Sequence, residues 1–190
     1  INVQAGILTA KNIIDASDAQ RNTRVGSNAG NSFDGTNAVD NTLIGYDAGT
    51  AITTGDKNVA VGSYALDANT TASYNIAVGY NALSATTTGG INVAVGDEAM
   101  KLNTTGVENV AVSSYALDAN TTASQNTAVG YNALTATTTS GHNTGVGYNV
   151  LAANTTGDGN VAVGSGALES CTTGTKNTAV GTHALDVVTT

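Results

Sequence analysis

The sequence predicts an all-β chain that folds as a parallel β-solenoid (β-roll) of 17-residue coils, and three observations support this prediction. A unit of seventeen residues, clearest as NTAVGYNALTATTTSGH at 126–142, recurs without insertion along most of the chain. Small and β-branched residues alternate at the start of each unit, which is typical of a strand. Each unit also contains a Thr-Thr pair within a turn-forming segment such as NTTG. Repeats in this length range stack into solenoids whose coils contact only their neighbours.

The repeat divides the chain into a short connecting segment and one elongated domain. Residues 1–21 do not fit the unit, and we expect an N-terminal connecting segment with one or two short strands. The β-solenoid repeat domain spans 22–190. Its first coil is two residues longer than the others, and we place the extra residues in the loop NSFDGTNAVD. Phe33 in this loop either caps the open end of the core or belongs to a simple bulge. About ten coils begin at Asn22, Asn41, Asn58, Asn75, Asn92, Asn109, Asn126, Asn143, Asn160 and Asn177.

The positions of the unit, numbered as columns one to seventeen from its Asn, predict which side chains form the core. Column one is always Asn, and we expect its amides to form a hydrogen-bonded ladder between coils. From residue 41 onward column four is always Val or Ile and column nine is mostly Leu, so we predict that both point into the core. The predicted core ladder consists of Val61, Val78, Val95, Val112, Val129, Val146, Val163 and Val180, with Leu66, Leu83, Leu117, Leu134, Leu151, Leu168 and Leu185.

Column three, which is Ala in most coils, bears on the number of chains. Strand alternation places it opposite column four, and a free solvent face would favour Thr over Ala. The Ala face must therefore meet another surface at close range. That surface is either the other wall of the same coil or the partner chains of a trimer. We favour a homotrimer because one Val, one Leu and a few Ala make a thin core for each coil.

Composition and spacing argue against several classes of function. The net charge of −8, with only six scattered Lys and Arg, disfavours nucleic acid as a partner. No run of eighteen apolar residues is present, so we expect no membrane insertion. His142 and His183 fall in different columns, with no Cys, Asp or Glu expected beside either. Asp67, Asp118 and Glu169 of column ten are three coils apart, too far to share a metal. We therefore predict no catalytic site, no metal site and no cofactor.

Three surface features have both a functional and a structural interpretation. Four Asn-Thr-Thr segments are formally glycosylation sequons, but turn chemistry also explains them. The Thr-Thr ladder suggests ice binding, although adjacent strand residues point to opposite faces and cannot form one flat array. Tyrosines in columns six and seven either stack on sugars of a host glycan or pack against neighbouring coils. The sequons begin at Asn69, Asn103, Asn120 and Asn154, and the tyrosines are Tyr46, Tyr80, Tyr131, Tyr148, Tyr64 and Tyr115.

The motif N-x-A-V-G-x-x-A-L carries a resemblance that covers 22–190. It resembles the NTAVG-x-x-AL-x-x-NTTG arrays of tail-fibre and structural proteins from tailed phages, often marine ones. The segment NxAVG is also similar to the SVAIG motif in YadA-like heads of trimeric autotransporter adhesins, which are left-handed parallel β-rolls assembled as trimers. The adhesin heads use a shorter repeat, and this sequence shows no neck, stalk or membrane anchor. The resemblance implies a left-handed, trimeric β-roll.

Repeat and resemblance together lead us to expect a structural fibre or adhesin segment without enzymatic activity. The most specific expectation is a phage tail-fibre rod that spaces or presents a host-receptor-binding region. Its location would be the virion or an extracellular surface, and its partners would be copies of itself and a host glycan or receptor. A self-assembling extracellular filament or a bacterial surface adhesin head is the alternative, and a Thr-ladder ice-binding protein is the third. Because Ile1 is not an initiator and Thr190 falls inside a repeat, we expect a piece of a longer protein or a processed form.

Overall fold

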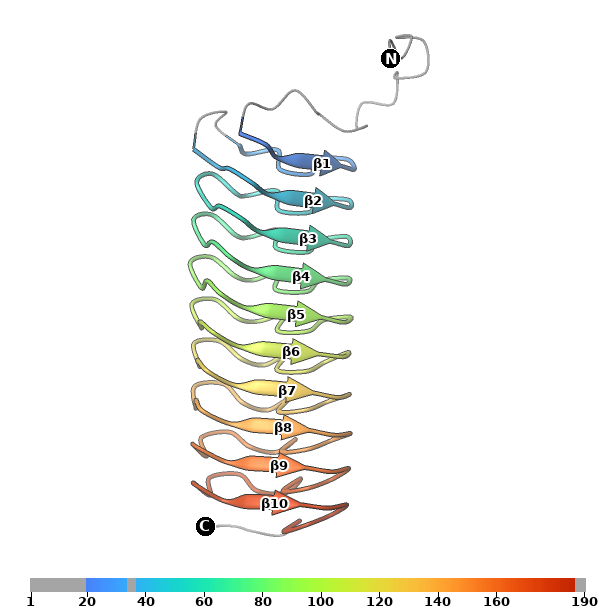
Figure 1. The fold of residues 1–190 in the computed structure, drawn as a ribbon, viewed down its shortest axis with the longest axis vertical. Helices are drawn as coiled ribbons and strands as arrows, with labels where there is room; N and C mark the ends of the chain where they lie inside the picture. Colours follow the sequence, from blue (N-terminus) through green and yellow to red (C-terminus); the bar gives the residue numbers. More distant parts are fainter. Residues whose placement is uncertain (1–19, 34–36, 187–190) are drawn as a thin grey trace.

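The chain folds as a parallel β-solenoid, which confirms the predicted fold class (Figure 1). The computed structural model describes residues 20–33 and 37–186, so most of the expected connecting segment lies outside the described residues. The ten strands pair in chain order into one sheet, and every pairing is parallel. No helix occurs among the described residues. The strands are β1 (Thr23–Val25), β2 (Thr42–Ile44), β3 (Val59–Val61), β4 (Ile76–Val78), β5 (Val93–Val95), β6 (Val110–Val112), β7 (Thr127–Val129), β8 (Thr144–Val146), β9 (Val161–Val163) and β10 (Thr178–Val180).

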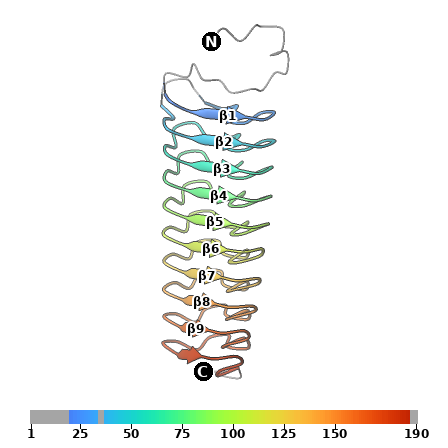
Figure 2. The same ribbon diagram turned by 45° about the vertical axis from the view of Figure 1, so that its right-hand side comes forward.

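Equivalent columns of successive coils lie directly over one another. Ala60 pairs with Ala77, for example, and Ala111 pairs with Ala128. The strands consequently form one straight column along the molecule in both views (Figures 1 and 2). Each strand covers only columns two to four, because column five bends the chain at a positive φ. At Gly62, where φ is +136°, a Cβ would collide with the carbonyl oxygen of Gly79 in the next coil, which explains the glycine there.

The first coil accommodates its two extra residues without disturbing the stack. Asn22 donates through Nδ2 to the carbonyl of Ala38, sixteen residues away, whereas the same bond spans fourteen residues in later coils. Ser32 still pairs with the next coil through Thr50, so the insertion follows Ser32. Phe33 packs against the core cluster, and the Arg24 guanidinium lies 5.5 Å from the centre of its ring. These contacts favour the capping interpretation of Phe33.

The prediction that column four points into the core is wrong. Column three lies inside: Ala60, Ala94 and Ala128 have no exposed surface. Column four lies on the outer face of the sheet, where exposure reaches 38% at Val163 and 71% at Val180. The outward residues of the predicted ladder are Val61, Val78, Val95, Val112, Val129, Val146, Val163 and Val180.

Column nine explains why the small residue of the strand faces inward. In most coils leucine from the opposite wall fills the interior and leaves room for little more than a methyl group. Leu66, Leu83, Leu117, Leu134, Leu151 and Leu168 are fully buried, as predicted, whereas Leu185 in the last coil is 49% exposed. Of the two surfaces considered for the Ala column, the structure therefore has the other wall of the same coil.

In two coils a large side chain in one column accompanies a small one in another. These pairs show that the side chains of columns three, eight and nine share one space. In the coil that begins at Asn41, Leu43 takes column three and Gly49 takes column nine, and a Cβ on Gly49 would lie 2.8 Å from Leu43 Cδ2. Gly145 takes column three where Val150 takes column eight, and a Cβ there would lie 3.0 Å from Val150 Cγ1. Each loss of volume on one wall is thus compensated on the other, as close packing requires.

The column-one asparagines form the predicted ladder between coils. Asn41 Oδ1 accepts hydrogen bonds from the backbone N–H of Asn58 at 2.9 Å and from Asn58 Nδ2 at 3.1 Å. Asn58 Nδ2 also donates to the Ala72 carbonyl across its own coil at 2.9 Å. These asparagines are fully buried from Asn41 to Asn160. One side chain therefore links two coils and satisfies a buried carbonyl and a buried N–H that would otherwise lack partners.

Column twelve contains a second buried polar ladder of more variable composition. Asn69 Oδ1 accepts from the Ala72 N–H at 2.9 Å, which fixes the turn after it. Where the residue is Thr86, its hydroxyl donates instead to the Asn103 carbonyl of the next coil at 3.0 Å. Cys171 occupies the same column and is fully buried. This column therefore tolerates several side chains because more than one bonding pattern satisfies the turn.

A pair of threonine substitutions tests which face of the strand is inside. Ala128→Thr adds volume and a hydroxyl to the filled interior, so we expect a loss of about 2–4 kcal/mol in the free energy of unfolding. Val129→Thr changes an outward side chain of almost equal shape and should cost less than about 1 kcal/mol. Urea denaturation followed by circular dichroism measures both. A larger loss for Val129→Thr would restore the original interpretation of column four.

A second pair of variants makes the same Asn→Thr change in each of the two buried polar ladders, so that their contributions to stability can be compared. Asn109→Thr leaves the Asn126 N–H and the Ala123 carbonyl without their side-chain partner, and we expect a loss of about 2–4 kcal/mol in stability. Asn103→Thr should cost about 1 kcal/mol, because Thr86 and Thr137 show that column twelve accepts this residue. Urea unfolding of both variants gives the comparison. Equal losses would mean that column one has no special role between coils.

Candidate functional site

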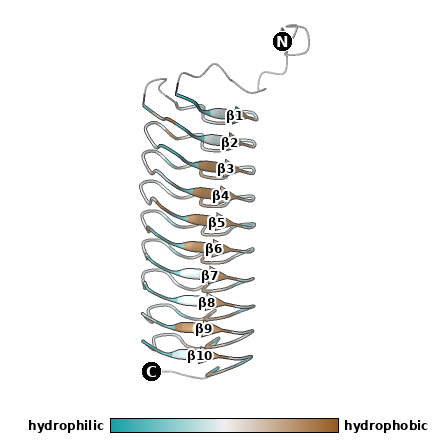
Figure 3. Cartoon of the chain, in the orientation of Figure 1, coloured by the Kyte–Doolittle hydropathy of each residue, from teal (hydrophilic) through white to brown (hydrophobic). Residues whose placement is uncertain are grey.

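The outer face of the sheet is uniformly uncharged. In all ten strands, columns two and four contain only Val, Ile or Thr. Figure 3 shows the most hydrophobic strands at β3 to β6 and at β9, where column two is Val or Ile. Exposure of the large side chains on this face includes 40% at Ile76 and 38% at Val161. The face is therefore a flat apolar surface that one chain leaves open to water.

The tyrosines of columns six and seven gather into two separate clusters. Tyr64 contacts Tyr46 and Tyr80 edge-on, with ring centres 5.4 and 6.0 Å apart. Tyr131 contacts Tyr115 edge-on and stacks on Tyr148, with both ring centres 5.7 Å away. Asp97 and Glu98 occupy the same columns in the coil between the clusters. The structure thus brings all six predicted tyrosines into two groups on consecutive coils.

These tyrosine clusters are packed at the rim and still offer exposed rings. Tyr148 is 56% exposed and Tyr80 is 51% exposed. Asp47 beside Tyr46 raises the pKa of that tyrosine, because a nearby negative charge disfavours the phenolate. The exposed rings of both clusters present a π-face together with a hydroxyl group. This chemistry suits a sugar surface, while the ring contacts also satisfy the structural interpretation.

The structure gives the sequon asparagines and one Thr column bonding roles inside the coil. Asn69, Asn103, Asn120 and Asn154 are fully buried, so their amides are not accessible for glycosylation in the folded chain. Thr70 Oγ1 donates to the Thr87 carbonyl of the next coil at 3.2 Å, and column thirteen repeats this bond. Column fourteen, which includes Thr71, is exposed, so the two Thr columns have different surroundings. A double Thr array for ice binding does not form.

The column-ten acids fall into two kinds of environment. Burial raises the pKa of Asp67 above its ordinary value, and its Oδ1 has no hydrogen-bond partner. Asp118 instead accepts a short hydrogen bond from the Thr135 hydroxyl in the following coil. Neither carboxylate is close to a histidine or another acid in a group that could hold a metal.

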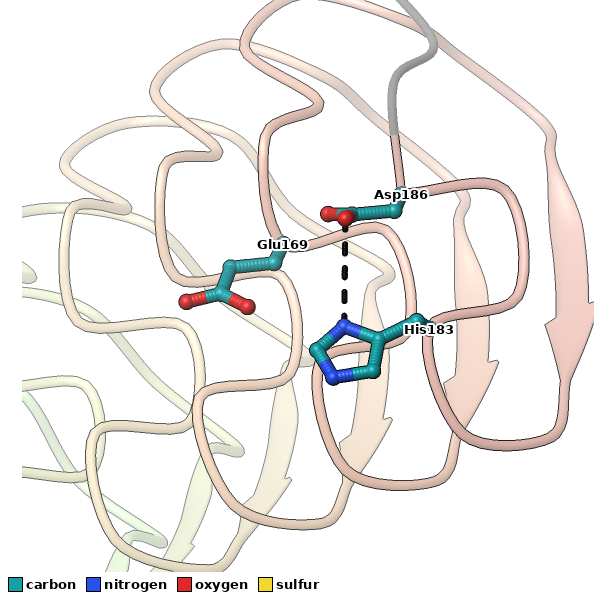
Figure 4. A group of neighbouring side chains, drawn as sticks. All are labelled: Glu169, His183 and Asp186. Carbon is teal, nitrogen blue, oxygen red and sulfur yellow. Dashed lines mark ion pairs between the residues drawn. The ribbon is translucent and has the colours of Figure 1, made fainter.

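The expectation that no acid lies beside His183 is wrong. Glu169, His183 and Asp186 each place a ligand atom within 4.8 Å of the other two (Figure 4). His183 Nδ1 lies 3.8 Å from Asp186 Oδ2 in the same coil, and Glu169 comes from the coil before. His142 likewise lies near an acid, with 3.4 Å between its Nδ1 and Asp158 Oδ1. The repeat spacing contained this signal, because Glu169 and Asp186 share column ten in consecutive coils.

Comparison with known proteins adds no relative. No family model matches the chain, and neither a curated protein nor a solved structure matches it. Among the residues that the structure describes, no helix has the length and apolar character needed to cross a membrane. The features of this chain that bear on its function are the sheet face, the tyrosine clusters and the group around His183.

Proposed function

We propose that this chain is a structural segment of a fibre or adhesin without enzymatic activity, and specifically a phage tail-fibre rod. The rod spaces or presents a region that binds a host receptor, on a virion or another extracellular surface. One observation carries the proposal: ten coils stack in an unbroken register that buried asparagine ladders fix at each step. A straight column of this kind holds its two ends at a constant separation. The resemblance to phage fibre arrays supplies the biological setting.

The proposed homotrimer assembles through the outer face of the sheet. The Ala column cannot form the interface, because its side chains already fill the coil. The apolar surface that remains open is that of columns two and four, and parallel sheets are normally covered on both faces. Three copies around a common axis would cover these faces with Val, Ile and Thr. Trimeric state and left-handed coil both follow from the resemblance to the adhesin heads and stay predictions.

Electron microscopy of the full-length native assembly tests the rod and the trimer together. We expect a thin, straight segment of about 43 Å for these coils at the usual strand spacing, with threefold symmetry in cross-section. A globular particle without such a segment would contradict the proposed function. Coils of successive chains stacked end to end would support the self-assembling filament instead.

Light scattering on the 190-residue chain tests whether the outer face of the sheet is the trimer interface. The wild type should have three times the chain mass of 18.7 kDa. Val129→Lys should lower that mass while circular dichroism stays unchanged, because it places a charge on the outer face. A well-folded wild-type monomer at micromolar concentration would exclude the trimer.

Contact with host glycans is the second proposed activity, and the exposed tyrosine clusters favour it. A glycan array with Tyr131→Ser combined with Tyr148→Ser tests it, since Ser63 and Ser114 show that column six accepts serine. We expect binding at least about tenfold weaker, which corresponds to about 1.4 kcal/mol. Tyr74→Gln is the control, because this exposed tyrosine lies outside both clusters and Gln125 occupies its column. Unchanged binding of the double variant, or no glycan bound by the wild type, would contradict this activity.

A further inference from the structure

Three side chains of types that can bind a metal lie close together on the rim of the last two coils. Glu169 lies in column ten of the coil that begins at Asn160, while His183 and Asp186 lie in columns seven and ten of the next coil. Their ligand atoms lie within 4.8 Å of one another. Figure 4 shows the imidazole directly below Asp186, with Glu169 beside them to the left. This is the one group of this kind among the described residues.

A glycine in the preceding coil provides the space for the imidazole. Gly166 is the glycine of column seven, and a Cβ there would lie 2.5 Å from His183 Nδ1 and 3.0 Å from Glu169 Oε2. The backbone does not require this glycine. Column seven is left-handed in every described coil, with φ of 54° at Asn132 and 51° at Asn149, and non-glycine residues occupy it elsewhere. Gly166 therefore differs from the column-seven residues of the other coils in one respect: it leaves room beside His183 and Glu169.

A further side chain orients one of the carboxylates. Asn149 donates through Nδ2 to Glu169 Oε1 at 3.2 Å. The other oxygen, Oε2, is the one that faces the space above Gly166. Contacts of this kind, outside the ligands themselves, fix ligand carboxylates in metal sites and increase their affinity. Asn149 thus holds Glu169 in the orientation that a shared ion would need.

The charges at this point are not balanced by the protein. Glu169 and Asp186 bring two carboxylates together, and neither forms an ion pair with a Lys or Arg among the described residues. His183 adds an imidazole nitrogen, which is a common metal ligand in proteins. A divalent cation would neutralise both carboxylates and satisfy the imidazole at once.

We infer that Glu169, His183 and Asp186 bind a divalent transition-metal ion of the zinc class. Zinc accepts imidazole nitrogen together with carboxylate oxygen, at about 2.0–2.2 Å from each, whereas magnesium and calcium prefer oxygen alone. Two ligands of one such ion are at most about 4.4 Å apart, so these side chains, which are exposed at His183 and half-buried at the two acids, need only small rotations to close around it. Three protein ligands leave a fourth position for water or for a group from another molecule. The inference is independent of the proposed fibre function.

Isothermal titration calorimetry of the 190-residue chain with ZnCl₂ tests the site. We expect one saturable equivalent per chain that a large excess of Mg²⁺ does not displace. His183→Asn should weaken binding at least about tenfold, the effect of losing a ligand or its support. Asparagine is compatible with the left-handed backbone of column seven, as Asn81 and Asn132 show. The matched control is His142→Asn, which removes the other histidine and should leave binding unchanged.

Gly166→Asn makes the test specific to the geometry. It leaves all three ligands in place but fills the space beside the imidazole, so it should also weaken zinc binding at least about tenfold. Circular dichroism must show that the variant is folded, and Asn149→Ala provides a smaller perturbation of the same site if it is not. The inference is overturned if the wild type binds no zinc, if Mg²⁺ competes equally, or if His142→Asn alone removes binding. Binding that survives in folded His183→Asn and Gly166→Asn would overturn it as well.

Discussion

The interior of each coil is narrow, and most of the structure depends on this limit. In most coils leucine from column nine fills it, so the strand opposite contributes only Ala to the inside. The β-branched residues of the strand must then face outward, because successive side chains alternate. A narrow interior therefore produces a wide apolar outer face. The same limit makes every coil alike, because a change on one wall must be compensated on the other.

Periodicity alone determined the fold class, the coil boundaries and the asparagine ladder, since a strict repeat of 17 residues permits few arrangements. The inward face was assigned incorrectly because larger apolar side chains usually point into a core, and a single strand pattern cannot show which face is filled. Two coils already indicated that column three faces inward. The large Leu43 in column three accompanies the small Gly49 in column nine, and the small Gly145 in column three accompanies the larger Val150 in column eight. The repeat spacing placed Glu169 beside Asp186 in column ten of consecutive coils, but the approach of His183 to both depends on left-handed turns in columns seven and nine, which the sequence does not reveal.

The rod separates nearly invariant positions from variable ones, and the candidate functions lie with the variable ones. Columns one, three and nine build the coil, whereas columns six, seven and ten vary at the rim. Tyr131 with Tyr148, and His183 with Glu169, are pairs formed by neighbouring coils within these variable columns. Because the scaffold holds equivalent columns in register, two substitutions one coil apart suffice to create a contact site. Binding chemistry can thus change without altering the packing of the interior.

The direction of the hydrogen bonds between coils determines how the molecule responds to tension. Because the strands stack along the long axis, these bonds run along it too, and a pull on the two ends stretches them directly. Coils would then peel away singly, each releasing seventeen residues and adding roughly 50–60 Å of extended chain. Near-identical coils would yield at nearly the same force, so the chain would lengthen at an almost constant load and absorb energy as it unwinds.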